Sequence, residues 1–171
     1  MLKLIGAILI CGGAAAIGLS LSGRLALRIR VLNSIINALD LMHAEICQLL
    51  TPIGELMESL KNTSDAPLSR LFAECVSGMN RSPDVPFAII WSKAVRGADY
   101  LELNSNEKQI LIDMGCALGR YDADEQGRCI AHARRTLEGR LCSAEAEKQK
   151  AGKLYGGLGI ICGIALVIVF I

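Results

Sequence analysis

Both ends of the chain are long segments without a charged residue, and no other feature constrains the fold as strongly. Residues 4–22 and 154–171 contain no Asp, Glu, Lys or Arg, although 20% of the whole chain is charged. A helix rises roughly 1.5 Å per residue, so each segment would span about 27–28 Å, close to the roughly 30 Å hydrocarbon core of a bilayer. We therefore predict two transmembrane helices, residues 4–22 and 154–171.

The second of these segments is the more hydrophobic. Leu, Ile, Val and Phe make up most of it, and each favours insertion by about 0.3–0.6 kcal/mol. The first segment is rich in Gly and Ala, so a cleaved signal peptide is an alternative. Only Lys3 precedes it, and Cys11 follows large residues where a lipoprotein cleavage site needs a small one. We expect the first segment to be retained as an anchor.

Basic residues gather on the side of each segment that faces the middle of the chain, at Arg24, Arg28, Arg30, Lys148, Lys150 and Lys153. Because Lys and Arg near the ends of a span favour the cytoplasm, we predict that residues 23–153 are cytoplasmic and both termini lie on the opposite side of the cell membrane. The odd number of cysteines in this middle part, without a C-x-x-C pair, predicts reduced residues that fill the core: Cys47, Cys75, Cys116, Cys129 and Cys142.

Small residues recur within both predicted spans. Gly12, Ala16 and Ser20 are four residues apart, and Gly159 and Gly163 form a G-x-x-x-G motif. Such spacing lets helix backbones approach closely, so these residues are candidates for packing on each other or on a partner. Since glycine is common in membrane helices, the alternative is that they form no interface.

The middle part of the chain is balanced in charge. All 17 acidic residues lie in it, and every basic residue except Lys3, out of 18, does as well. A nucleic-acid-binding surface usually needs an excess of basic residues to neutralise phosphates. We therefore expect no nucleic-acid partner.

Apolar spacings of three and four predict that the middle part is entirely helical. The first helix carries a stripe of Leu25, Ile29, Leu32, Ile36, Leu39, His43, Ile46 and Leu50. Thr51-Pro52 is expected to end it and to start a second helix over residues 52–61, with Thr51 as the N-cap. No alternating strand pattern competes with this interpretation.

Four more helices are expected after the second. Asp65 could cap the third, whose apolar face is Leu68, Leu71, Phe72 and Cys75, and residues 78–86 would follow as a break. The fourth carries Phe87, Ile90, Trp91 and Val95 and ends near Gly97. The fifth carries Ile110, Leu111, Met114 and Leu118 and could be capped by Asn104 or Ser105.

The last helix has the clearest start signal. Asp122 is an N-cap acid with Glu125 at the third helical position, and no strong breaker occurs before the second span. The predicted fold class is all-α: a cytoplasmic antiparallel bundle of about six helices. Its first and last helices are expected to be continuous with the N- and C-terminal transmembrane helices.

Catalytic motifs are scarce. The chain has no phosphate-binding P-loop, no G-x-G-x-x-G and no G-x-S-x-G. Its two histidines have no partners at the spacing of a known metal site. We expect no metal and no cofactor. An enzyme using Asp122, Asp124, Glu125 or His43 is the rival hypothesis, although a helix start explains the three acids.

Three stretches together carry a resemblance to a known family. They are residues 1–10 (MLKLIGAILI), Ala44-Glu45-Ile46 followed by Thr51-Pro52, and Leu118-Gly119-x-x-Asp122-x-x-x-Gln126. On these the chain resembles, end to end, the stage III sporulation protein AB family of endospore-forming bacteria.

The resemblance implies a non-enzymatic subunit of the mother-cell complex that forms a secretion-like channel to the forespore. Its cytoplasmic domain would be similar to those of type II secretion F platform proteins. The implied partners are a cytoplasmic ATPase, stage III sporulation protein AA, and other membrane subunits of the complex. A homo-oligomer is compatible with this role.

A turn that projects from a bundle is a natural contact point, so we predict partner contacts at Arg120, Asp122, Gln126, Arg134 and Arg135. The alternative for each residue is a solvated charge or a structural cap. A generic two-span regulator or chaperone unrelated to sporulation is a third class of function.

Overall fold

The computed structural model describes the backbone of residues 2–170 and the side chains of residues 23–150. The described backbone forms six α-helices and a short 3₁₀ helix, with no strands. The helices are α1 (Leu2–Cys47), α2 (Ile53–Thr63), α3 (Leu68–Arg81), α4 (Phe87–Gly97), η1 (Asp99–Leu101), α5 (Ser105–Gly115) and α6 (Ala123–Phe170). The predicted all-helical class and the number of helices are confirmed.

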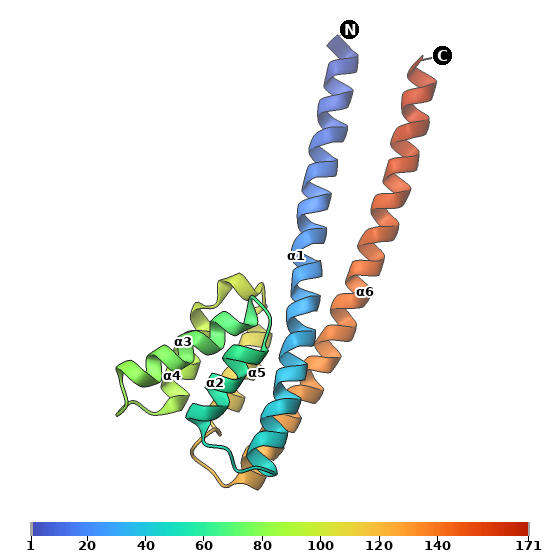
Figure 1. Cartoon of the computed structure of the whole chain (residues 1–171). Helices are drawn as coiled ribbons and strands as arrows, with labels where there is room; N and C mark the ends of the chain where they lie inside the picture. The colour runs from blue at the N-terminus through green and yellow to red at the C-terminus, as the bar shows by residue number, and fades with distance from the viewer. Residues whose placement is uncertain (1, 171) are drawn as a thin grey trace.

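The two longest helices, α1 and α6, form an antiparallel hairpin (Figure 1). Both chain termini lie at one end of this hairpin, and helices α2–α5 pack beside its other half (Figure 1). As predicted, α1 and α6 are each a single unbroken helix. The four short helices therefore pack against the α1–α6 pair, and the same two helices continue into the charge-free segments.

Among the residues with described side chains, no helix is long and apolar enough to cross a membrane. The predicted spans, residues 4–22 and 154–171, lie outside that range. The same holds for the predicted packing residues Gly12, Ala16, Ser20, Gly159 and Gly163.

The core lies where α1 meets both α6 and the short helices. The predicted stripe contributes Leu32, Ile36, Leu39 and Ile46, all buried. A second stripe on α1 is also buried and was missed by the single-face prediction: Val31, Ile35, Ala38 and Met42. Since α1 is covered from two directions, its apolar face is wider than that of a helix lying on a bundle surface. His43, assigned to the stripe, is exposed.

The predicted end of the first helix, at Thr51-Pro52, is wrong. Helix α1 stops at Cys47, and Leu50 adopts a left-handed conformation with φ of 54°. Thr51 does not cap the second helix, because its hydroxyl donates to the Glu45 carboxylate at 2.5 Å and its N–H donates to the Glu45 carbonyl at 3.0 Å. Thr51 closes the helix before it instead of starting the one after it.

The predicted break at Gly78 was also wrong, because α3 continues to Arg81. A Cβ at position 78 would lie 2.6 Å from Ile90 Cγ2. The glycine therefore allows α3 and α4 to approach closely, and it does not end the helix. The N-cap predicted at Asp65 is likewise absent, since α3 begins at Leu68 without a side-chain cap.

Other local predictions are confirmed. Asn104 caps α5 through a full capping box with Glu107. Asp122 caps α6, accepting a hydrogen bond from the Glu125 N–H at 2.8 Å. Leu118 is buried as expected, although it follows the end of α5 and lies in the turn before α6.

The cysteines fill the core less than predicted. All five described cysteines are free, but only Cys75 is buried, whereas Cys116 and Cys142 are exposed. Burial raises the pKa of the Cys75 thiol to about 12, with a smaller contribution from the Glu74 carboxylate. Cys75 therefore behaves as a small apolar residue and not as a nucleophile.

Candidate docking surface at the hairpin tip

The end of the α1–α6 hairpin that is far from the termini is formed by two loops (Figure 1). Residues 48–52 join α1 to α2, and residues 116–122 join α5 to α6. The two loops are held near each other by the helix ends beside them, because the Cys47 thiol at the end of α1 donates to the Ala123 carbonyl at the start of α6 at 3.5 Å. A Cβ on Gly119 of the second loop would lie 3.0 Å from Ile53 Cδ1 at the start of α2. We call these two loops the hairpin tip.

A self-contained hydrogen-bond network shapes the second loop. Gly119 has φ of 72°, a conformation that favours glycine. The Gln126 side chain accepts from the Gly119 N–H at 3.3 Å and donates to the Tyr121 carbonyl at 2.6 Å. Asp122 caps α6. The geometry of this turn therefore requires three residues of the pattern on which the family resemblance rests: Gly119, Asp122 and Gln126.

Arg120 and Tyr121 lie between these hydrogen-bonded positions, and their side chains take no part in the network. Both are exposed, and the guanidinium carbon of Arg120 lies 5.7 Å from the centre of the Tyr121 ring. A cation and an aromatic ring stacked in this way present a partly ordered surface to solvent. Asp122 and Gln126, the other partner contacts predicted near this turn, use their side chains to form the turn, whereas the Arg120 side chain does not.

The first loop exposes two leucines. The exposed fractions of Leu49 and Leu50 are 67% and 71%, and that of Tyr121 is 50%. Among the described residues only two other large apolar side chains, Val85 and Ile89, are exposed. The tip therefore holds three of the five exposed large apolar side chains of the described residues, and such a grouping marks an interaction site more strongly than scattered single residues do. Leu50 was predicted on the helical stripe of α1, and Pro52, two residues later, is the sequence signal that could have placed it in a loop.

The two predicted contact residues on α6 have different surroundings. Arg134 bridges the hairpin, pairing with Asp40 of α1 at 2.9 Å and with Glu138 of α6 at 2.9 Å. Arg135 is exposed and makes no ion pair with any described residue. Arg134 is thus engaged within the hairpin, while Arg135 is available to a partner.

The acids and histidine of the rival enzyme hypothesis do not form a metal-binding group. Asp122 caps α6, Glu125 pairs with Arg128, and Asp124 and His43 are exposed. Within the described part of the chain, no three His, Cys, Asp or Glu residues are placed to hold a metal ion. The structure shows how each of these residues is used locally and shows no shared site.

Arg28 forms ion pairs that join three helices at the end of the bundle opposite the hairpin tip, and these pairs were not predicted from the sequence. Glu107 of α5 is completely buried, and Arg28 of α1 donates to it at 2.6 Å. The other end of the Arg28 guanidinium lies 3.6 Å from Glu147 of α6. The hydrogen bond to Glu107 is the main reason that the pKa of Arg28 is raised. Arg28 had been counted only as a basic residue next to the first predicted span.

Comparisons with known proteins agree with the predicted family. The family model described as "Stage III sporulation protein AB (spore_III_AB)" matches residues 3–171. Stage III sporulation protein AB of Bacillus subtilis (strain 168) is 27% identical over 169 residues, which cover 98% of each chain.

A solved structure of stage III sporulation protein AB has the same fold. It superposes with a TM-score of 0.66 at 25% identity and covers 72% of this chain and 98% of its own. These matches support a role in sporulation. The chain belongs to the stage III sporulation protein AB family.

Proposed function

We propose that this protein is a non-enzymatic membrane platform of a secretion-like sporulation complex. In this proposal residues 4–22 and 154–171 anchor it in the mother-cell membrane, and residues 23–153 form a cytoplasmic helical bundle similar to type II secretion F domains. The bundle docks a cytoplasmic ATPase that resembles stage III sporulation protein AA. Other membrane subunits of the complex would pack beside the anchors.

The observation that carries the proposal is the continuity of α1 and α6. The helices that end in the charge-free segments are the same helices that hold the hairpin tip. At roughly 1.5 Å per residue, the 23–47 part of α1 would place the tip about 37 Å from the membrane surface. Two rigid connections restrict the orientation of the tip, so that motion of a bound motor can be transmitted to the bilayer.

The tip has the composition expected of a docking surface. Leu50 is exposed and is held in a left-handed backbone conformation, which costs a non-glycine residue about 1 kcal/mol or more. An exposed leucine in a strained conformation does not stabilise the described fold, so we attribute its role to contact with a partner. Leu49 and Tyr121 would add further apolar surface, and Arg120 would add a cation beside the exposed Asp122 carboxylate.

The proposal is tested by locating the ATPase in sporulating cells. Deleting residues 23–153 while keeping both terminal segments should release the ATPase from the membrane fraction. A control that keeps residues 23–153 between two unrelated membrane anchors should retain it. Unchanged retention after the deletion would rule out docking by this domain.

The same cells test the two rival functions. Full sporulation by Asp124→Ala and His43→Ala variants is expected of a platform, whereas loss of sporulation with normal protein levels would favour an enzyme. Expression outside the mother cell would favour a generic two-span regulator.

A further inference from the structure

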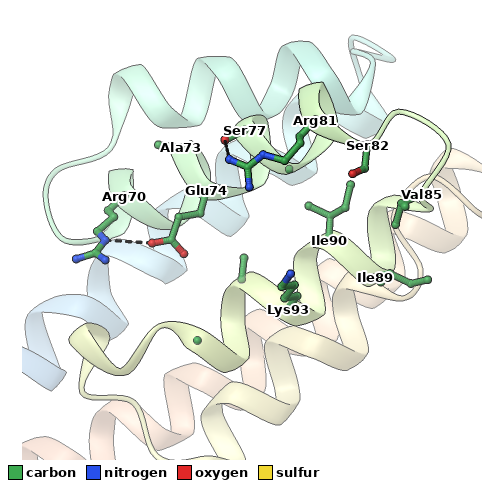
Figure 2. A pocket seen from close by; sticks show the side chains of 13 residues that line it. Arg70, Ala73, Glu74, Ser77, Arg81, Ser82, Val85, Ile89, Ile90 and Lys93 are labelled. Atoms are coloured by element: carbon green, nitrogen blue, oxygen red, sulfur yellow. Dashed lines mark hydrogen bonds and ion pairs between the residues drawn. The ribbon is translucent and has the colours of Figure 1, made fainter.

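A second surface with exposed apolar residues lies between α3 and α4, away from the hairpin tip. The two helices leave an open groove of about 780 Å³ on their solvent side (Figure 2). Val85 and Ile89, the exposed large apolar residues that are not at the tip, both line it. All five exposed large apolar side chains of the described region therefore belong to one of two surfaces.

The walls of the groove repeat with the period of a helix. Arg70, Glu74, Ser77 and Arg81 line it from α3 at spacings of four, three and four, and Ile89 and Lys93 line it from α4 at a spacing of four. These two rows of side chains form ridges on either side of an elongated depression, and a third helix can pack between two such ridges. Residues 70–81 extend for about 17 Å, or roughly three helical turns.

The floor of the groove is formed where α3 and α4 pack closely against each other. Ile90 packs directly on the backbone of α3 at Gly78, where a Cβ would lie 2.6 Å from Ile90 Cγ2. Trp91, the next residue, is buried against Phe72 and donates from Nε1 to the Leu111 carbonyl at 2.6 Å. The floor is therefore fixed to the core and is already formed without a ligand.

The rim of the groove has an excess of positive charge. Arg70, Arg81 and Lys93 surround it, and Glu74 is the only acid in its lining. Glu74 is neutralised by Arg70 at 3.0 Å, and it also lies 3.3 Å from the Tyr100 hydroxyl. Among the residues with described side chains, Arg81 donates only to the Ser77 hydroxyl, at 3.4 Å, and Lys93 makes no ion pair. Two cations, one on each wall, face solvent across an apolar floor (Figure 2).

We propose that this groove binds an amphipathic helix of a partner protein, with an apolar stripe on the floor and acidic residues on both flanks. The apolar floor selects the stripe, the two ridges select a helix, and Arg81 and Lys93 select acidic flanks. This inference goes beyond the proposed function and does not depend on it, because the groove and the hairpin tip share no residue.

Designed peptides test the charge and shape of the occupant. The probe is a helical peptide of about 14 residues, or four turns, with one leucine stripe and glutamates beside it. One control peptide has lysines in place of the glutamates, and another has the same composition in scrambled order. Binding is read from methyl shifts of the full chain in phosphatidylcholine nanodiscs. We expect the acidic peptide to bind at least tenfold more tightly than either control and to shift Val85, Ile89 and Ile90.

Charge reversal on the protein gives the matching test. Lys93 is exposed, so the Lys93→Glu variant should fold normally. It should bind the acidic peptide at least tenfold more weakly and the lysine peptide more tightly. Arg140→Glu, at an exposed position of α6 outside both surfaces, is the control and should change neither affinity.

Several results would overturn the proposal. These are equal binding of the three peptides, shifts confined to Leu49 and Leu50 at the tip, or an unchanged preference in Lys93→Glu. Shifts of the groove methyls on changing to phosphatidylglycerol nanodiscs, without peptide, would assign the groove to lipid and would also overturn it.

Discussion

Arg28 and Glu107 are 79 residues apart in the chain, yet the Arg28 guanidinium donates to both oxygens of the Glu107 carboxylate, with the shortest distance at 2.6 Å. Glu107 is completely buried and also accepts from the Asn104 N–H at 2.9 Å as part of the α5 capping box. The pair therefore fixes the start of α5 to α1, just beyond the first predicted span.

Removing Arg28 should leave a buried carboxylate without its charge partner. Breaking such a pair typically costs about 3–5 kcal/mol, and since the Arg28 side chain is 19% exposed we expect about 3 kcal/mol for Arg28→Ala. The measurement is unfolding of the full chain in micelles, followed by helical circular dichroism. The double variant Arg28→Ala, Glu107→Leu should recover part of the loss. A double variant less stable than Arg28→Ala would contradict this explanation.

Gly115 should not tolerate a side chain. A Cβ there would lie 1.9 Å from Trp91 Cδ1, and Trp91 is held by its hydrogen bond to Leu111. We expect Gly115→Ala to lower the free energy of unfolding by about 1–3 kcal/mol. Because Trp91 is the single tryptophan, its fluorescence should shift as well. Gly139→Ala on α6 is the control, since that site is open and the change should stabilise the helix by about 0.5–1 kcal/mol.

Stability should fall in alkaline solution partly because of Tyr100. Burial, with a smaller effect of the Glu74 carboxylate, raises the pKa of Tyr100 from 10.0 to about 12. Between these values the unfolded chain releases the phenolic proton and the folded chain keeps it, so the free energy of unfolding decreases as pH rises. Tyr100→Phe should make the decline between pH 10 and pH 12 shallower in melting curves. Equal slopes for the two proteins would be evidence against a partly buried phenol that stays protonated in the folded chain.

Leu50→Gly should separate stability from binding. The left-handed backbone at position 50 suits glycine, so the variant should be at least as stable as the natural chain and could gain up to about 1 kcal/mol. The same change removes an exposed apolar side chain from the tip and should weaken docking. Thermal unfolding measures the first effect, and a loss of stability would show that Leu50 packs within its own fold.

The sequence predicted the helices well because their apolar spacings and start signals are local. Asn104 and Asp122 cap the helices predicted for them, and the helices around Phe72 and Trp91 occur where their apolar residues indicated. The errors arose where a residue has two structural roles. Gly78 is typical of a break but serves a close helix contact, and Thr51 is typical of an N-cap but binds back to Glu45.

The candidate surfaces were only partly predictable. The turn from Gly119 to Asp122 was identified from its local pattern, but the two exposed leucines of the tip, Leu49 and Leu50, come from a loop about 70 residues earlier in the chain. The groove depends on how α3 and α4 pack, which local periodicity does not specify. The buried partner of Arg28 was missed for the same reason, although the Asn104-x-x-Glu107 spacing already marked the carboxylate as ordered.

Recruitment of the ATPase to membranes by the hairpin tip tests the central claim most directly. Liposomes carrying the full chain are mixed with the purified ATPase and floated on a density gradient. Each exposed leucine is worth about 1.5–3 kcal/mol when buried, so the double variant Leu49→Ser, Leu50→Ser should reduce the floated ATPase at least tenfold. Ile89→Ser, a change at an exposed apolar residue in the α3–α4 groove, should leave it unchanged. Equal flotation by all three proteins, or none by the natural chain, would contradict the account.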